Sequence, residues 1–200
     1  KKVESKTFQN DFIKVRNYLS TLDKGAGVGI VLPKDHRYFL TMMACMSSGI
    51  FYVPMTDKYP KNRIDQIIEQ TDIKLLITDD IFSSILNSEI NDFNEPQLDD
   101  EQPLYKMCTS GSTGKPKAVV IPRRAYANFA KWVDTEFSYI NETDSLIQVT
   151  EFTFDISLFD VALFLTKGCD FYLSQFQGNI FHLAYEIEQY KITVLNTVVN

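Results

Sequence analysis

The residues best suited to chemistry lie in one run near the middle of the chain, Met107-Cys108-Thr109-Ser110-Gly111-Ser112-Thr113-Gly114-Lys115-Pro116-Lys117. Gly111 and Gly114 allow positive φ angles and a close approach of the backbone to a ligand. Successive N–H groups in such a turn converge on an anion. Further donors are the hydroxyls of Thr109, Ser110, Ser112 and Thr113. The run therefore predicts a loop that wraps a polyanion, with positive charge from Lys115 and Lys117.

A run rich in Ser, Thr and Gly is more often an ordinary connector, so the charges around it matter. It is not a Walker A loop, because Thr109 and Pro116 stand where that loop needs Gly and Ser or Thr. Strand-like runs flank it at residues 104–108 and 118–121. No Asp or Glu occurs from Gln102 through Val133 in a chain of net charge −6. The basic residues of that segment are Lys106, Lys115, Lys117, Arg123, Arg124 and Lys131. A basic island of this kind predicts a local anionic ligand and not a nucleic acid bound over a wide face.

A second candidate site is the aromatic, acidic stretch from Phe152 to Asp160. Ser157 and Asp160 form a Ser-x-x-Asp pattern ahead of an apolar run, which predicts a capping box at a helix start. Asp155 precedes that cap and has no capping role of its own. We expect it near the positive end of the helix in partly apolar surroundings, where a carboxylate needs a cationic partner. From the residues alone, a local Arg or Lys, simple exposure and a ligand all remain open.

The elements that must position these residues alternate between short β-branched runs and amphipathic helical spacing. Strands are expected near 28–32, 51–53, 75–78, 104–108, 118–121, 146–149, 171–173 and 193–195. Helices are expected around 8–19, 39–46, 64–68, 126–137, from about 157, and 180–187. This alternation predicts an α/β fold of layered, mostly parallel sheets covered by helices. The acidic stretch 87–101 is expected to be a solvated surface connection, with a regulatory acidic patch as a second reading.

The totals exclude several classes of protein. No apolar run approaches the length of a membrane span, so no membrane partner is expected. The three cysteines, Cys45, Cys108 and Cys169, are odd in number and widely spaced. They form neither a disulfide framework nor a zinc pattern, so we expect buried, reduced thiols in a cytoplasmic protein.

The mid-chain run from Thr109 to Lys117 resembles the phosphate-loop signature of the adenylate-forming superfamily, which includes acyl-CoA synthetases, luciferases and peptide-synthetase adenylation domains. An earlier segment, Gly49-Ile50-Phe51-Tyr52-Val53-Pro54 with Tyr59-Pro60 and Arg63, is also similar to that family, and a structural role is expected for it. Phe154-Asp155-x-Ser157 resembles a motif of the amino-acid-activating branch. Phe129-x-x-Trp132 and Asp160 resemble D-alanine–carrier protein ligase. The chain departs from the family's pattern at Ala118, usually Gly, and at Arg123, often His.

The resemblance implies activation of an amino acid by ATP and Mg²⁺, giving aminoacyl-AMP and pyrophosphate. The β- and γ-phosphates would be held by Thr109, Ser110, Gly111, Ser112, Thr113, Gly114 and Lys117. Thr109 and Lys117 are expected in catalytic roles. Asp155 would pair with the α-ammonium group of the substrate, and Ile156 and Phe159 would line the side-chain pocket. The acyl group would then pass to a phosphopantetheine thiol on a carrier protein.

The resemblance covers essentially all of residues 1–200, but only the front part of the family's catalytic unit, so the isolated piece is expected to be inactive. Two other interpretations stay open. An acyl-CoA synthetase would act on a carboxylic acid without the amino group, and loss of the Asp155 carboxylate would leave that activity unharmed. A site that pairs with the ammonium group should reject such acids by roughly 10⁴-fold or more. A non-enzymatic binding module would keep its ATP affinity in a Lys117→Ala variant.

Overall fold

The computed structural model describes residues 3–89, 95–110, 116–176 and 178–197. The chain divides into two compact units, Lys1–Arg124 and Ala125–Asn200. We call them the first and the second unit and describe each by itself.

The first unit is built around a five-stranded sheet in the order β3-β1-β2-β4-β5. Its elements are α1 (Ser5–Leu19), β1 (Gly27–Leu32), α2 (His36–Ser48), β2 (Phe51–Thr56), α3 (Lys61–Thr71), β3 (Leu75–Ile77), α4 (Asp79–Leu86), β4 (Pro103–Ser110) and β5 (Pro116–Pro122). The pairs β1–β2, β1–β3 and β2–β4 are parallel, whereas β5 runs antiparallel to β4. The predicted α/β fold with a mostly parallel sheet is confirmed. The antiparallel pair lies at the predicted loop, because strands joined by so short a connection can only form a hairpin.

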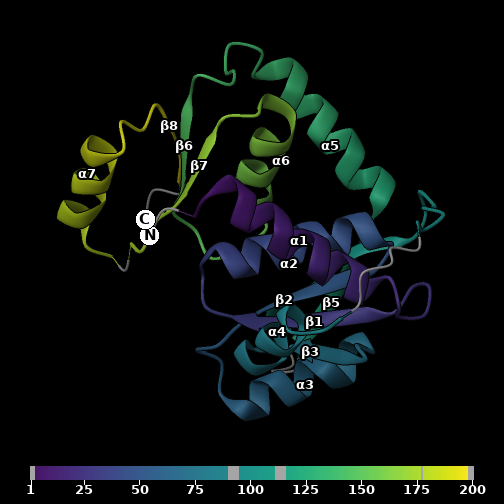
Figure 1. Cartoon of the computed structure of the whole chain (residues 1–200). Helices are drawn as coiled ribbons and strands as arrows, with labels where there is room; N and C mark the ends of the chain where they lie inside the picture. The colour runs from purple at the N-terminus through teal and green to yellow at the C-terminus, as the bar shows by residue number, and fades with distance from the viewer. Residues whose placement is uncertain (1–2, 90–94, 111–115, 177, 198–200) are drawn as a thin grey trace. The chain divides into compact units, whose positions relative to one another are not determined.

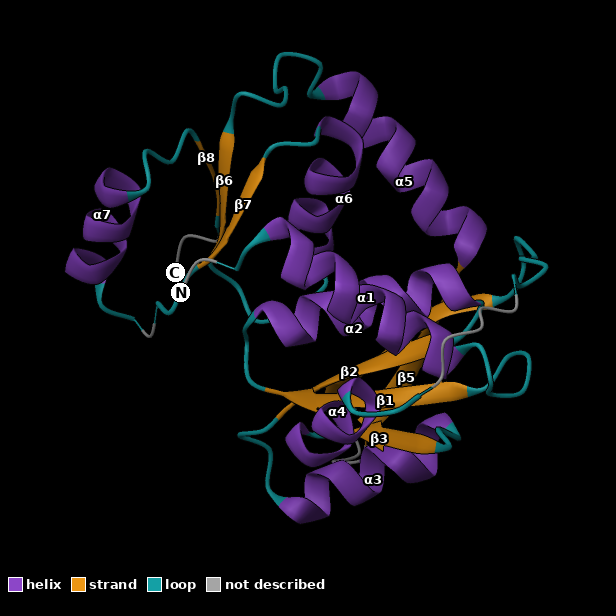
Figure 2. Cartoon of the chain, in the orientation of Figure 1, coloured by secondary structure: helices purple, strands orange, loops and turns teal. Residues whose placement is uncertain are grey.

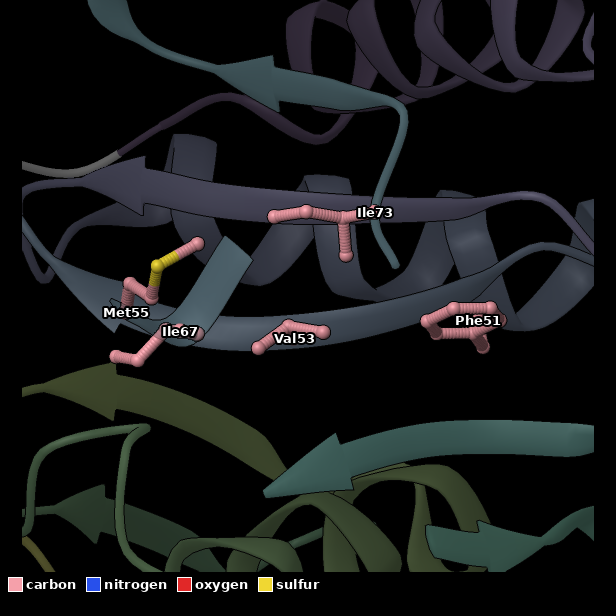
Figure 3. Close-up of a cluster of buried hydrophobic side chains, with 5 residues drawn as sticks. All are labelled: Phe51, Val53, Met55, Ile67 and Ile73. Carbon is pink, nitrogen blue, oxygen red and sulfur yellow. The ribbon is translucent and has the colours of Figure 1, made fainter. Parts of the chain in front are cut away.

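The central strands are apolar throughout because helices cover both faces of the sheet. Figures 1 and 2 show α1 and α2 on one side of the sheet and α3 on the other. Alternate residues of β2 point toward α3, where Phe51, Val53 and Met55 pack with Ile67 and Ile73 (Figure 3). This two-sided burial is the arrangement that near-continuous apolar strands predict.

Helix α4 was not predicted from the sequence. It begins after Thr78, whose hydroxyl accepts a hydrogen bond from the Ile81 amide at 3.5 Å. Asp79 and Asp80 occupy its first turn, where negative charge stabilises a helix N-terminus. The helix has only two buried side chains, Phe82 and Ile85, so its apolar stripe is too short to be recognised by periodicity.

The second unit contains a three-stranded parallel sheet in the order β7-β6-β8. Its elements are α5 (Arg123–Glu136), which begins within the first unit, β6 (Ser145–Gln148), α6 (Ser157–Lys167), β7 (Asp170–Leu173), α7 (Ile180–Gln189) and β8 (Val194–Asn196). Leu183 of α7 packs on Ile147 and Val149. Figure 1 shows α6 and α7 on opposite sides of this sheet. The Lys167 ammonium group lies 2.8 Å from an Asp134 carboxylate oxygen and so joins α6 to α5.

All three cysteines are free thiols. Cys45 and Cys169 are buried, as predicted, whereas Cys108 is half-buried. Burial raises the pKa of each of these thiols. The cytoplasmic location based on them stays a prediction. The described part of the chain contains no helix that is both long and apolar enough to cross a membrane. Described residues 95–101 of the acidic stretch are nearly all exposed and lie outside helices and strands, which fits the expected surface connection.

Candidate functional site

The predicted phosphate loop joins the two strands of the β4–β5 hairpin. Its stem consists of Thr109 and Ser110 on β4 and of Pro116 and Lys117 on β5. Thr109 pairs with Lys117 across the hairpin, and the Thr109 hydroxyl donates a hydrogen bond to the Lys117 carbonyl at 3.4 Å. The side chains of Thr109 and Lys117 are both exposed. The structure thus brings together the two residues expected in catalytic roles.

The turn itself lies outside the described residues. It comprises Gly111, Ser112, Thr113, Gly114 and Lys115. Their expected contacts with phosphates therefore stay predictions.

Lys106 anchors the hairpin below the loop. Its ammonium group donates a hydrogen bond to the Thr71 carbonyl at 2.8 Å and lies 4.0 Å from the centre of the Phe51 ring. Thr71 is the last residue of α3, where backbone carbonyls without a partner in the helix attract a cation. Strand β4 is therefore tied to α3 at a point three residues before the predicted loop begins.

The basic island, which predicts a local anionic ligand, is also partly structural. The Arg123 guanidinium donates a hydrogen bond to the Met46 carbonyl in the last turn of α2 at 2.8 Å, and burial lowers the pKa of Arg123. Arg124 lies 2.5 Å from a Glu101 carboxylate oxygen. Together with Lys106, these residues hold elements of the first unit together. Lys117 is the member of the island that the structure places, exposed, on the stem of the loop.

The second candidate site is the turn at residues 154–159, which we call the Asp155 turn. Its backbone is closed by the amides of Ser157 and Leu158, which donate to the carbonyls of Phe154 at 3.1 Å and Asp155 at 2.9 Å. The Asp155 carboxylate accepts a hydrogen bond from the Ile156 amide at 2.9 Å. Asp155 is exposed and Phe154 is 61% exposed. The predicted position at a helix N-terminus is correct, and Asp155 lies exposed between the apolar residues Phe154 and Ile156.

The predicted capping box is also wrong. Helix α6 begins at Ser157, its N-cap residue is Ile156, and no side chain caps it. The Ser157 hydroxyl instead donates to the Phe154 carbonyl at 2.6 Å. Asp160 is fully buried, and its Oδ1 accepts a hydrogen bond from Nδ2 of Asn196 at 3.0 Å. A partner from a distant strand thus takes the place of the local cap.

The two predicted pocket residues lie on the Asp155 turn and are partly exposed. The Phe159 ring packs edge-on against Phe137, with 4.9 Å between ring centres. It also approaches Phe129, and Phe129 stacks on Trp132 at 5.8 Å. Ile156 bears the carbonyl that receives a second hydrogen bond from Asn196, at 3.4 Å. Asn196 was missed by sequence reasoning, since no local pattern joins it to α6.

The described residues offer no group of three or more His, Cys, Asp or Glu that could hold a metal ion. Mg²⁺ in phosphate chemistry is commonly bound through one or two carboxylates and the substrate phosphates, so the predicted Mg²⁺ stays a prediction. The phosphate-loop stem belongs to the first unit and the Asp155 turn to the second.

Comparison with known proteins gives a family match over most of the chain. A family model described as AMP-binding enzyme matches residues 14–200. Bacitracin synthase 1 of Bacillus licheniformis is 27% identical over 181 residues, covering 88% of this chain and 3% of that protein. A dimodular nonribosomal peptide synthase of Bacillus subtilis (strain 168) is 28% identical over 178 residues, covering 77% of this chain and 7% of that protein. The chain spans between 3% and 16% of the length of such curated relatives.

Solved structures share the fold. The Klebsiella oxytoca NpsA N-terminal subdomain in complex with 3-hydroxyanthranilyl-AMSN superposes with a TM-score of 0.83 at 23% identity, covering 98% of this chain and 53% of that chain. An artificially fused adenylation-PCP di-domain, NpsA-ThdA, gives a TM-score of 0.84 at 23% identity, covering 98% of this chain and 42% of that chain. Similarity at this level of identity establishes a common fold.

Proposed function

Because this chain belongs to the AMP-binding enzyme family, we propose that it is part of an enzyme that activates an amino acid with ATP. The resemblance to the adenylate-forming superfamily is confirmed by that match. A relative named as a nonribosomal peptide synthase supports an amino acid as the substrate. The NpsA-ThdA fusion of an adenylation domain with a PCP supports a phosphopantetheine-bearing carrier protein as the partner that receives the acyl group.

The proposed reaction joins a substrate carboxylate oxygen to the α-phosphorus of ATP. The bond from that phosphorus to the bridging oxygen breaks, and pyrophosphate leaves with the electron pair. The role of the protein is to hold two anions together and to offset the charge that develops on the leaving group. We assign the β- and γ-phosphates to the predicted loop and the charge at its stem to Lys117. The exposed, adjacent positions of Thr109 and Lys117 support this assignment.

Mg²⁺ would neutralise phosphate charge when bound to the nucleotide. The described residues contain no group of three or more His, Cys, Asp or Glu that could hold a metal ion, and the proposal assigns no step to the metal.

The observation that most supports an amino acid as the substrate is the exposed carboxylate of Asp155 at the N-terminus of α6. The turn presents it beside the partly exposed side chains of Ile156 and Phe159. A carboxylate that accepts only one hydrogen bond within the turn retains acceptor capacity for an ammonium group. We therefore assign Asp155 to the α-ammonium group, and Ile156 and Phe159 to the substrate side chain.

The test is ATP–pyrophosphate exchange by the full-length protein, first over a panel of L- and D-amino acids and then with Asp155→Ala. We expect the variant to lose about 100-fold or more in kcat/KM for the amino acid, because a charged partner is removed. Its KM for ATP should not change. An Asp155→Ala variant that keeps full activity and selectivity for the amino acid would contradict the assignment.

A second candidate substrate is an acid without an α-ammonium group. It is favoured by the solved NpsA N-terminal subdomain in complex with 3-hydroxybenzoyl-AMSN. The same assay separates the two, since this candidate predicts unchanged activity of Asp155→Ala with such an acid. The same unchanged activity of Asp155→Ala is expected if the enzyme is an acyl-CoA synthetase.

A further inference from the structure

One side chain of the second unit bridges the Asp155 turn and the adjoining sheet. Asn196 is the last residue of β8. Its Nδ2 lies 3.0 Å from Oδ1 of Asp160 and 3.4 Å from the carbonyl oxygen of Ile156. These two acceptors belong to the residue before α6 and to the first turn of α6. A single amide from the strand therefore links β8 to the N-cap residue and to the first turn of α6.

The surroundings of this bridge make it a rigid contact. Asp160 is fully buried, and Ser157 and Leu158 in the same turn are buried as well. The Asp160 carboxylate lies in the first turn of α6, where the helix dipole favours negative charge. A carboxylate at this depth needs hydrogen-bond donors, and Asn196 supplies one of them. Loss of the amide would remove a hydrogen bond from a buried polar group in the first helical turn, which is costly.

Asp155 is coupled to this bridge through the backbone. Its carboxylate is held by the amide of Ile156, whose own carbonyl accepts the bond from Asn196. The Asp155 carbonyl accepts a hydrogen bond from the Leu158 amide at 2.9 Å. The position of the exposed carboxylate is therefore set by a piece of backbone that Asn196 fixes to the carboxyl end of β8. In open parallel sheets this is the edge at which ligands bind.

We propose that Asn196 and Asp160 are positioning residues for Asp155, and that they set the selectivity for a substrate ammonium group without contacting it. This inference rests on the proposed function of Asp155. An ion pair in a binding site requires accurate placement, because a displacement of about 1 Å can cost roughly 100-fold in rate. The bridge supplies that placement by joining the strand to the helix start through a partly buried contact.

The test uses the full-length protein and the amino acid identified by the exchange assay. Asn196→Ala should lower kcat/KM for the amino acid by about 10- to 100-fold. It should also reduce the preference for the amino acid over its des-amino analogue, with the KM for ATP unchanged. Thr193→Val is the matched control. The Thr193 hydroxyl bonds Asp144 at 2.7 Å just before the other end of β8, so this variant should lower the melting temperature without altering amino-acid selectivity.

A reversed pair separates positioning from simple loss of stability. Asn196→Asp places two carboxylates face to face and should reduce selectivity more than Asn196→Ala does. Asp160→Asn combined with Asn196→Asp restores an amide–carboxylate pair. It should recover part of the selectivity, limited by the new carboxylate facing the Ile156 carbonyl. If the alanine variant unfolds by circular dichroism, Asn196→Leu takes its place, since it keeps the side-chain volume but has no donor.

The outcomes are distinct. Wild-type selectivity in folded Asn196→Ala or Asn196→Leu, with selectivity lost in Asp155→Ala, would overturn the positioning role and leave the proposed function standing. Wild-type selectivity in Asp155→Ala would overturn both. A reversed pair that is no more selective than Asn196→Asp would also count against the bridge.

Discussion

Asp144 links two parts of the second unit through a single carboxylate. Its Oδ2 accepts a hydrogen bond from the Asn141 amide at 3.0 Å, and its Oδ1 accepts one from the Thr193 hydroxyl at 2.7 Å. These bonds lower the pKa of Asp144, the backbone bond first and the Thr193 bond second. Because both bonds favour the ionised carboxylate, they stabilise the fold only while Asp144 is charged.

The pH dependence of stability follows from that shift. A carboxyl group whose pKa is lower in the folded state stabilises the fold above its unfolded pKa, about 3.9 for Asp. That contribution disappears as the pH falls through the lower folded value. Asp144→Asn should therefore melt below the wild type near neutral pH, and the difference should shrink as the pH falls below the unfolded pKa of about 3.9. Thermal melts across this range test it, with exposed Glu142→Gln as the control. A difference that grows toward acid pH would contradict the account.

The hydrogen-bond partners of individual side chains were the features predicted least accurately from the sequence. Ser157 and Asp160 match a capping box by spacing, but Asp160 bonds Asn196, 36 residues away. Lys106 and Arg123 were counted as charges for a ligand, yet both bond carbonyls near helix C-termini. In each case a tertiary partner outcompetes the local one, and nothing within a few residues signals it.

At the scale of elements, the contact between β1 and β2 depends on a glycine. A Cβ added to Gly27 would lie 2.1, 2.2 and 2.8 Å from three atoms of the Phe51 ring. Gly27 pairs with Phe51 across the two strands, and Phe51 packs in the cluster that β2 forms with α3. The ring therefore occupies the space that a side chain at position 27 would need.

Gly27→Ala should destabilise the protein by about 1–3 kcal/mol, because the added methyl group forces the ring out of its packed position. Urea denaturation measures the loss. In a Phe51→Leu background the same methyl group should cost less, giving a coupling energy between the two positions. Equal costs in both backgrounds would show that the ring is not the obstacle.

Helices with long apolar periodicity were predicted well, whereas the short helix α4 was missed. Helices α2, α5 and α7 were expected near their observed positions, because apolar residues recur on the inward face of each helix over several turns. Helix α4 is too short for such a repeat, and its start depends on Thr78. The antiparallel pairing of β4 with β5 was implicit in the short loop between two strand-like runs, but pairing direction cannot be read from periodicity itself.

At the scale of the whole molecule, the family and the fold class followed from a few residues. The run from Thr109 to Lys117 carried the resemblance, and the match over residues 14–200 confirms it. The division into two units was not predicted, because no Gly/Pro-rich linker marks it. The break falls at Arg124 and Ala125, within α5. The phosphate-loop stem lies in the first unit and the Asp155 turn in the second.

The rate of thiol alkylation tests the burial of each cysteine in the two units. The thiolate is the reactive species, and burial raises the pKa of all three thiols. With iodoacetamide at about pH 8, half-buried Cys108 should react first. The buried thiols of Cys45 and Cys169 should react only when the structure around them opens locally. Mass spectrometry of peptides gives the three rates, and urea-unfolded protein gives the reference. Modification of Cys45 in the folded protein at the unfolded rate would contradict its burial.

Cys45 lies in the first unit and Cys169 in the second, so each unit contains a buried thiol whose alkylation rate reports its unfolding. Comparing the two labelling curves along a urea gradient would tell whether both parts melt in a single step or one outlasts the other, without any engineered probe.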